Sequence, residues 1–153
     1  MKPIEIKSFN DPTFALISAG TDGLRRILVV DDETDSRQLT MDVLMRSGYE
    51  VEGVENGAAG WEAAQTRDYD LIVTDNKMPK MGGVEMIKKL RAANMAVPVI
   101  MATGLMPTHE FVRRPWLKPE VMLEKPHTDD ELLAAVKSLL GTDDGTQARN
   151  TRR

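Results

Sequence analysis

The sequence alternates five times between a short apolar run and a longer segment with helical periodicity. A helical segment is long enough to connect neighbouring strands that run in the same direction, which a tight turn is too short to do. The runs are rich in Ile, Leu and Val, a composition typical of strands covered on both faces. We therefore predict an α/β fold, a three-layer sandwich with a five-stranded parallel sheet. The predicted strands are residues 27–30, 50–54, 71–74, 97–102 and 121–123.

Four of the segments that follow these runs carry apolar residues at helical spacing. In the first, Leu39, Val43 and Leu44 recur at this spacing, and Gly48 follows as a stop signal. We expect the helices to cover both faces of the sheet. The other three helices are marked by Trp61, Ala64 and Gln65, by Val84, Ile87 and Leu90, and by Leu132, Leu133, Val136, Leu139 and Leu140.

The alternation occupies residues 25–141 and leaves a segment at each end. The 153 residues are enough for one ordinary domain with a buried core. Residues 1–24 do not follow the repeat and contain several turn signals, so we expect an N-terminal extension there. Residues 142–153 are polar and predict a flexible, solvated tail.

Composition narrows the classes of function. The formal net charge of −4 gives no broad basic surface, so we expect no direct nucleic-acid partner. The absence of cysteine excludes disulfides, thiolate metal sites and cysteine nucleophiles. No stretch approaches the ~20 apolar residues that a membrane span needs, and no signal-peptide core is present. We therefore expect a soluble, cytoplasmic protein without a membrane partner.

Acidic side chains follow two of the predicted strands at their carboxyl ends. Asp31 and Asp32 follow the first strand, and Asp75 follows the third. In open parallel sheets, ligands bind beyond these ends, where the strand order reverses. In a flavodoxin-like order 2-1-3-4-5, the first and third strands are neighbours, so the three carboxylates would converge. Carboxylates at such close range repel one another unless a cation lies among them, and oxygen ligands suit Mg²⁺.

Two further polar residues, Thr103 and Lys125, lie at the ends of the fourth and fifth predicted strands. Mg²⁺ completes its coordination with water and phosphate oxygens, so the acidic cluster predicts a phosphoryl group as well. Lys125 would supply a cation for one phosphoryl oxygen, and Thr103 a hydroxyl donor for another. Phosphoryl transfer depends mainly on such charge neutralisation. Asp75 is then the candidate nucleophile, because carboxylates form acyl phosphates.

Each of these residues also has a purely structural explanation. Residues 31–33 could cap the first helix, where acidic side chains are favoured. Lys125 and Pro126 could form an ordinary strand end, and Thr103 and Gly104 an ordinary turn. Their joint occurrence, in order and each at a strand end, favours a phosphoryl site.

The motifs around these residues resemble the receiver domain of two-component response regulators. The resemblance covers roughly residues 25–141. It implies that Asp31 and Asp32 organise Mg²⁺, that Asp32 and Asp75 are direct ligands, and that the backbone carbonyl of Lys77 is the third protein ligand. The motifs are Leu28-Val29-Val30-Asp31-Asp32, Val73-Thr74-Asp75-Asn76-Lys77-Met78-Pro79 with Gly82-Gly83, Met101-Ala102-Thr103-Gly104 and Leu123-Glu124-Lys125-Pro126.

The same resemblance implies a signalling protein that is not an enzyme and only assists its own phosphorylation and dephosphorylation. Asp75 would take a phosphoryl group from a phosphohistidine on a histidine kinase or a histidine phosphotransfer protein. Thr103 and Lys125 would contact the phosphoryl oxygens, and a cis peptide bond would precede Pro126. The phosphorylated form would bind an output protein. Whether phosphorylation promotes a homodimer stays open.

Two features depart from the family pattern. Met122 stands three residues before the lysine, where receivers commonly carry a Tyr or Phe that moves inward on phosphorylation. Pro107, Pro115 and Pro119 bracket the segment that corresponds to the fourth helix, so any helix within 108–114 would be short. Many receivers use this face for output, and we therefore expect an unusual choice of partner.

Three other classes of function are open to a chain with these residues. A Mg²⁺-dependent phosphohydrolase usually has a second carboxylate two residues after its Asp nucleophile, where this chain has Lys77. A module for FMN or nucleotides needs a phosphate-binding loop after the first strand, and the acidic residues 31–33 would repel phosphate. A pseudo-receiver, which binds partners without phosphorylation, is favoured only by Met122 and the proline-rich segment.

Overall fold

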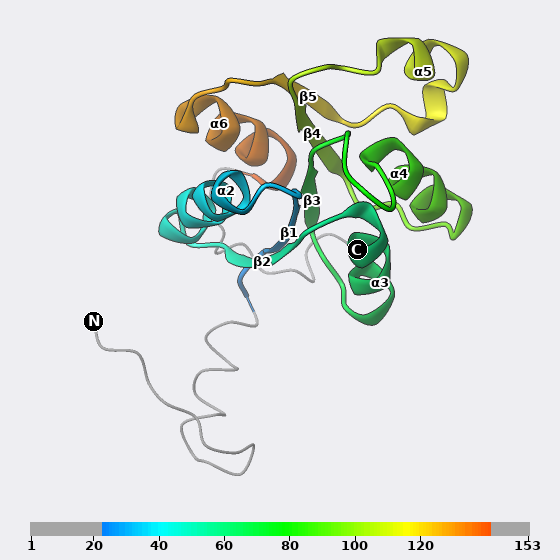
Figure 1. Cartoon of the computed structure of the whole chain (residues 1–153). Coiled ribbons are helices and arrows are strands. Elements are labelled where there is room, and N and C mark those ends of the chain that lie inside the picture. Colours follow the sequence, from blue (N-terminus) through cyan, green and yellow to red (C-terminus); the bar gives the residue numbers. More distant parts are fainter. Residues whose placement is uncertain (1–22, 142–153) are drawn as a thin grey trace.

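A five-stranded parallel sheet lies at the centre of the structure, a computed structural model that describes residues 23–141 (Figure 1). The strand order is β2-β1-β3-β4-β5, and every neighbouring pair is parallel. The predicted fold class and strand order are therefore confirmed. The extension predicted for residues 1–24 lies outside the described residues except for 23 and 24, and the tail predicted for 142–153 lies wholly outside them. The strands are β1 (Arg26–Val30), β2 (Glu50–Val54), β3 (Leu71–Thr74), β4 (Val99–Thr103) and β5 (Val121–Glu124).

Helices cover both faces of the sheet, with α2 and α6 on one face and α3, α4 and α5 on the other (Figure 1). Asn56 caps α3, because its side-chain oxygen accepts a hydrogen bond from the Ala59 amide at 2.8 Å. Thr128 begins α6 through a reciprocal capping box with Glu131. The helices are α2 (Thr34–Arg46), α3 (Gly57–Thr66), α4 (Gly83–Ala92), α5 (Thr108–Arg113) and α6 (Asp129–Leu140), with a 3₁₀ turn η1 (Pro115–Leu117). Among residues 23–141, none of these helices has the length and apolarity needed to cross a membrane.

Successive residues of β1 face opposite helical layers, which explains why this central strand is apolar at consecutive positions. Ile27 and Val29 belong to the core that α2 and α6 cover, whereas Leu28 and Val30 belong to the core beneath α3 and α4. All four side chains are buried. Full burial of such a side chain contributes ~1.5–3 kcal/mol, so β1 holds both layers to the sheet.

The strands all run in the same direction, and their carboxyl ends lie together at one edge of the sheet. The loops that follow β1, β3, β4 and β5 meet at this edge. Since α6 runs back from the carboxyl end of β5, the start of β1 and the end of α6 lie at the opposite edge. Gly141 ends α6 with a φ of 96°, which glycine adopts without strain.

The structure differs from the sequence-based prediction at the start of the fourth strand and at one helix position, and three other strand ends differ by one residue. The fourth strand begins at Val99, so the predicted start at residue 97 is wrong by two residues. Pro98 precedes the strand and has no N–H to donate to a neighbour. Leu39 shares the helical spacing of α2 but is 66% exposed, so it lies outside the core that α2 covers.

The Tyr69 phenol links the loop before β3 to the edge strand β2. Tyr69 is buried and donates a hydrogen bond to a carboxylate oxygen of Glu52. Burial raises the pKa of Tyr69 above its ordinary value of 10.0, although the charges of Arg67 and Arg26 act in the opposite direction. The unfolded chain therefore loses this proton at a lower pH than the folded protein does.

Below pH 10.0 we expect the ionisation of Tyr69 to have no effect on the free energy of unfolding. Above pH 10.0 this free energy should fall as the pH rises to the raised pKa of Tyr69 in the folded protein. Tyr69→Phe should remove this alkaline component, because phenylalanine has no proton to lose. Urea unfolding of both proteins across the alkaline range measures the difference. Parallel pH profiles for the two proteins would contradict the assignment.

Candidate functional site

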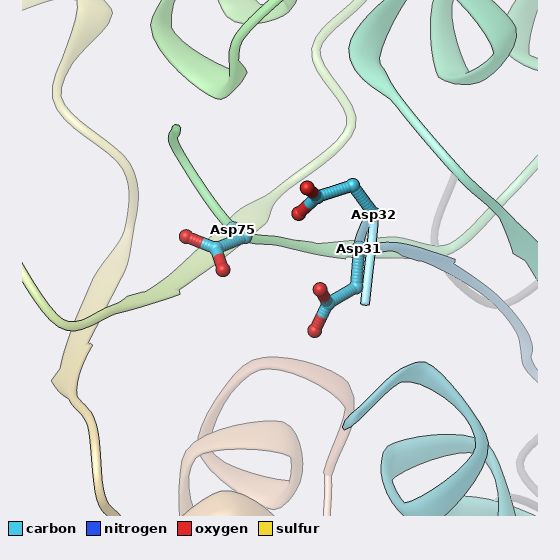
Figure 2. A group of neighbouring side chains, drawn as sticks. All are labelled: Asp31, Asp32 and Asp75. Carbon is cyan, nitrogen blue, oxygen red and sulfur yellow. The ribbon is translucent and has the colours of Figure 1, made fainter. Parts of the chain in front are cut away.

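Two neighbouring strands bring three carboxylates together at the carboxyl edge of the sheet (Figure 2). Asp31 and Asp32 follow β1, Asp75 follows β3, and these strands pair in parallel up to Val30 and Thr74. One oxygen from each carboxylate lies within 4.8 Å of the others. The predicted convergence of these residues is thus present in the structure. Asp31 is buried, Asp75 is half-buried, and Asp32 is exposed at the mouth of the cluster.

Lys125 places an ammonium group between two of these carboxylates. Its Nζ donates to Asp75 Oδ2 at 3.1 Å and to Asp31 Oδ2 at 3.3 Å. The peptide bond to Pro126 is cis, as the family resemblance implies. Burial acts to lower the pKa of Lys125, but the charges and hydrogen bonds of Asp31 and Asp75 outweigh burial and raise this pKa above 10.5. The ammonium therefore stays charged and offsets part of the carboxylate repulsion.

Thr103 is the last residue of β4 and is buried. Its carbonyl accepts a hydrogen bond from the Lys125 amide at 3.0 Å, which holds the ends of β4 and β5 together. Lys77 is exposed in the loop between β3 and α4, two residues after Asp75. The predicted site residues thus all lie on loops or strand ends at the same edge of the sheet.

Asn76 organises the loop that carries Lys77, and sequence analysis did not identify this function. Its amide donates to Asp75 Oδ1 at 2.6 Å, and its carbonyl accepts from the Gly83 amide at 2.9 Å. Its side-chain oxygen accepts from the Val84 amide at 3.1 Å. One residue therefore fixes the Asp75 carboxylate, the loop and the start of α4. The signal in the sequence is an Asn followed by a glycine pair at a helix start.

Asp31 is engaged by the protein to a greater extent than the other two carboxylates. Its Oδ1 accepts from the Glu33 amide at 3.0 Å, and its Oδ2 accepts from the Ser36 hydroxyl at 2.6 Å in addition to Lys125. Its own carbonyl accepts from the Arg37 guanidinium at 2.8 Å. Glu33, which occupies the N-cap position of α2, makes no side-chain capping bond.

The donor set of the cluster fits a hard divalent cation. Mg²⁺ prefers oxygen ligands and binds through one or two carboxylates while it keeps several waters. Asp32 and Asp75 are accessible from solvent, and Lys125 compensates only one of the three negative charges. The cluster therefore offers both the oxygen donors and the net negative charge that a divalent cation requires.

The segment after β4 exposes large apolar side chains. The predicted short helix is present as α5, which begins after Pro107 and is followed directly by η1. Phe111 of α5 is buried, whereas Val112 and Trp116 are 79% and 65% exposed. Met122 on β5, at the position where receivers commonly carry an aromatic residue, is also exposed. Exposed apolar side chains therefore lie on both α5 and η1.

Comparison with known proteins identifies the family. The chain matches the family model of the response regulator receiver domain over residues 27–137. It is 34% identical to the transcriptional regulatory protein CusR of Escherichia coli K12 over 115 residues, which is 75% of this chain and 51% of CusR. It is 33% identical to the chemotaxis protein CheY1 of Helicobacter pylori over 123 residues, which is 78% of this chain and 99% of CheY1. The chain thus spans about half the length of CusR and almost all of CheY1.

Solved structures share the same fold. The chemotaxis protein CheY4 of Vibrio cholerae has a TM-score of 0.70 and 28% identity, and the match covers 76% of this chain and 98% of CheY4. The response regulator TrrA of Thermotoga maritima, solved in complex with Mg²⁺-BeF, has a TM-score of 0.67 and 30% identity, with 76% and 99% covered. Fold and acidic cluster together define a signalling domain of the two-component class. The chain belongs to the response regulator receiver domain family.

Proposed function

We propose that this chain is a phosphoacceptor receiver that takes a phosphoryl group onto Asp75. The observation that carries the proposal is the 3.1 Å contact between Asp75 Oδ2 and Lys125 Nζ, beside the carboxylates of Asp31 and Asp32. A nucleophilic oxygen, a fixed cation and oxygen ligands for a metal lie together, as transfer to a carboxylate requires. Family membership supports this function.

The cluster would hold Mg²⁺. Following the family resemblance, we propose Asp32 and Asp75 as direct ligands. Asp31, which is buried and accepts three hydrogen bonds from the protein, would organise the site. The backbone carbonyl of Lys77 is the proposed third ligand. When bound, Mg²⁺ would neutralise charge that develops on the phosphoryl oxygens. The Mg²⁺-BeF complex of the related TrrA supports this assignment.

The transfer step is a displacement at phosphorus. An oxygen of Asp75 forms a bond to the phosphorus of a phosphohistidine while the nitrogen–phosphorus bond breaks, and the departing imidazole takes up a proton. Lys125 and the Thr103 hydroxyl donate hydrogen bonds to the phosphoryl oxygens. The product is an acyl phosphate on Asp75.

The donor would be a histidine kinase or a histidine phosphotransfer protein. The added charge at Asp75 would draw Thr103 and Lys125 toward the phosphoryl group and shift a two-state equilibrium of the loops. An output protein, or a second copy of the chain, would then bind the shifted surface. The exposed Met122 favours one alternative, a pseudo-receiver that binds its partner without phosphorylation, because no aromatic ring is present there to move inward.

Intact mass spectrometry after incubation with Mg²⁺ and acetyl phosphate tests the function. We expect one phosphoryl increment on the wild-type chain, none on Asp75→Asn, and none when a chelator removes Mg²⁺. Asp68→Asn is the matched control, because Asp68 is an exposed aspartate that precedes β3 at the opposite edge of the sheet. This variant should be modified as the wild type is.

If the wild type gains no increment even from a phosphorylated kinase, while calorimetry registers Mg²⁺ binding, phosphotransfer is excluded. The pseudo-receiver then becomes the function to pursue. Equal modification of wild type and Asp75→Asn would instead place the phosphoryl group on another residue.

A further inference from the structure

Ser36 connects α2 to the charged cluster, although it belongs to none of the sequence motifs. It lies half-buried in the first turn of α2. Its hydroxyl donates to Asp31 Oδ2 at 2.6 Å and accepts from Lys125 Nζ at 3.3 Å. The donor of this side chain and one of its acceptor sites are both directed at the cluster.

The Lys125 ammonium has three N–H donors, and it has three acceptors in this structure. They are Asp75 Oδ2 at 3.1 Å, Asp31 Oδ2 at 3.3 Å and Ser36 Oγ at 3.3 Å. Asp31 and Ser36 are also hydrogen-bonded to each other, and Asp31 directly follows β1 while Ser36 lies in α2. Two of the three contacts are therefore to groups that phosphorylation does not change chemically.

We infer that Ser36 is a positioning residue that, together with Asp31, holds two N–H donors of Lys125 so that the third can switch from the Asp75 carboxylate to a phosphoryl oxygen. The inference rests on the proposed phosphorylation of Asp75. In this arrangement α2, through Ser36, contributes one of the groups that hold Lys125 in position. Loss of the hydroxyl leaves one N–H of Lys125 without this acceptor and Asp31 without its shortest hydrogen bond.

Hydrogen bonds to charged groups have net contributions that correspond to a change of roughly ten- to a hundredfold in an equilibrium or rate, and the lower end applies to a half-buried group such as Ser36. We therefore expect Ser36→Ala to slow phosphorylation by acetyl phosphate and Mg²⁺ about tenfold. Ser36→Thr keeps the hydroxyl and should restore most of the rate. Ser138→Ala is the matched control, because the Ser138 hydroxyl makes an equally short bond of 2.6 Å, but to the Ala135 carbonyl of its own helix.

A second measurement examines Lys125 in the full chain without Mg²⁺ or a phosphoryl donor. Side-chain ammonium protons that three acceptors hold exchange slowly with water and can be followed by nitrogen-detected NMR, with Lys125→Arg used to assign the signal. We expect a protected Lys125 signal in the wild type, Ser36→Thr and Ser138→Ala, and at least about fivefold faster exchange in Ser36→Ala. Unchanged exchange in Ser36→Ala, or an unprotected signal in the wild type, overturns the inference.

The two measurements separate failure of the inference from failure of the proposed function. If neither acetyl phosphate nor a phosphorylated kinase modifies the wild type, the phosphoacceptor function fails, while the ammonium signal still reports whether Ser36 holds Lys125. If the wild type is modified and Ser36→Ala is modified at the same rate, the inference fails and the function stands. A slow Ser36→Ala variant that Ser36→Thr does not rescue also overturns it, because a positioning hydroxyl must be replaceable by another.

Discussion

Gly83→Ala should destabilise the protein by about 2–3 kcal/mol and should also impair any reaction at Asp75. A methyl group at residue 83 would lie 2.4 Å from the Asp75 carbonyl oxygen and 3.2 Å from the Asn76 Cα. Both are backbone atoms, so relief requires α4 to move away from the loop after β3. The same movement would break the 2.9 Å hydrogen bond from the Gly83 amide to the Asn76 carbonyl. Alanine's better helix propensity offsets only about 1 kcal/mol of this cost.

Gly104→Ala is the control for this substitution. A methyl group there has no neighbouring atom within 4 Å, and its cost should stay within about 0.5 kcal/mol. Urea unfolding of the two variants beside the wild type gives the difference in the free energy of unfolding. Similar midpoints for Gly83→Ala and Gly104→Ala would mean that the start of α4 shifts at little cost.

Lys125→Met should cost about 2–3 kcal/mol of stability when Mg²⁺ is absent. The variant keeps an unbranched side chain that reaches as far as the lysine Cε, but it leaves the Asp31 and Asp75 carboxylates, 7% and 17% exposed, without their shared cation. Removal of one partner from a fully buried pair typically costs about 3–5 kcal/mol. The effect should be smaller here because the Lys125 side chain is itself 28% exposed.

Saturating Mg²⁺ should recover much of this loss. A ligand at a hundred times its dissociation constant stabilises a folded protein by about 2.7 kcal/mol, and a cation no longer repelled by the ammonium should bind the variant more tightly. Thermal unfolding of wild type, Lys125→Met and the exposed-surface control Lys118→Met, with and without Mg²⁺, measures both effects. A variant as stable as the wild type without metal would show that the ammonium contributes nothing to the fold.

The sheet was predictable because each central strand is buried on both faces and is therefore apolar at consecutive positions. Asp31, Asp32 and Asp75 could be placed together because parallel strands bring all their carboxyl ends to one edge. The strand order itself is not encoded in the alternation of runs and helices. We predicted the order 2-1-3-4-5 from the flavodoxin-like arrangement, and the parallel pairing of β1 with β3 agrees with it.

Ser36 and Asn76 could not be found in the same way. Ser36 meets Lys125, which lies 89 residues further along the chain, and only the packing of α2 beside the loop between β5 and α6 creates that contact. Asn76 bonds to the backbone amides of Gly83 and Val84 at the start of α4, and a pattern of side chains carries little information about contacts to backbone groups. Helical spacing likewise did not indicate that Leu39 is exposed. It shares a face of α2 with the buried Val43 but lies one turn nearer the start of the helix, and spacing does not show where along a helix burial begins.

The polarity of the sheet also determines how this domain can be attached to something else. Residues 23 and 141 both lie at the amino edge of the strands, and Asp75 lies at the carboxyl edge, roughly 16 Å away along a five-residue strand. A fluorophore, a resin or a fused protein joined at either residue would therefore leave the carboxylates open to a large phosphoryl donor. If Asp75 accepts a phosphoryl group as proposed, immobilised protein prepared in this way should be phosphorylated as fast as the protein in solution.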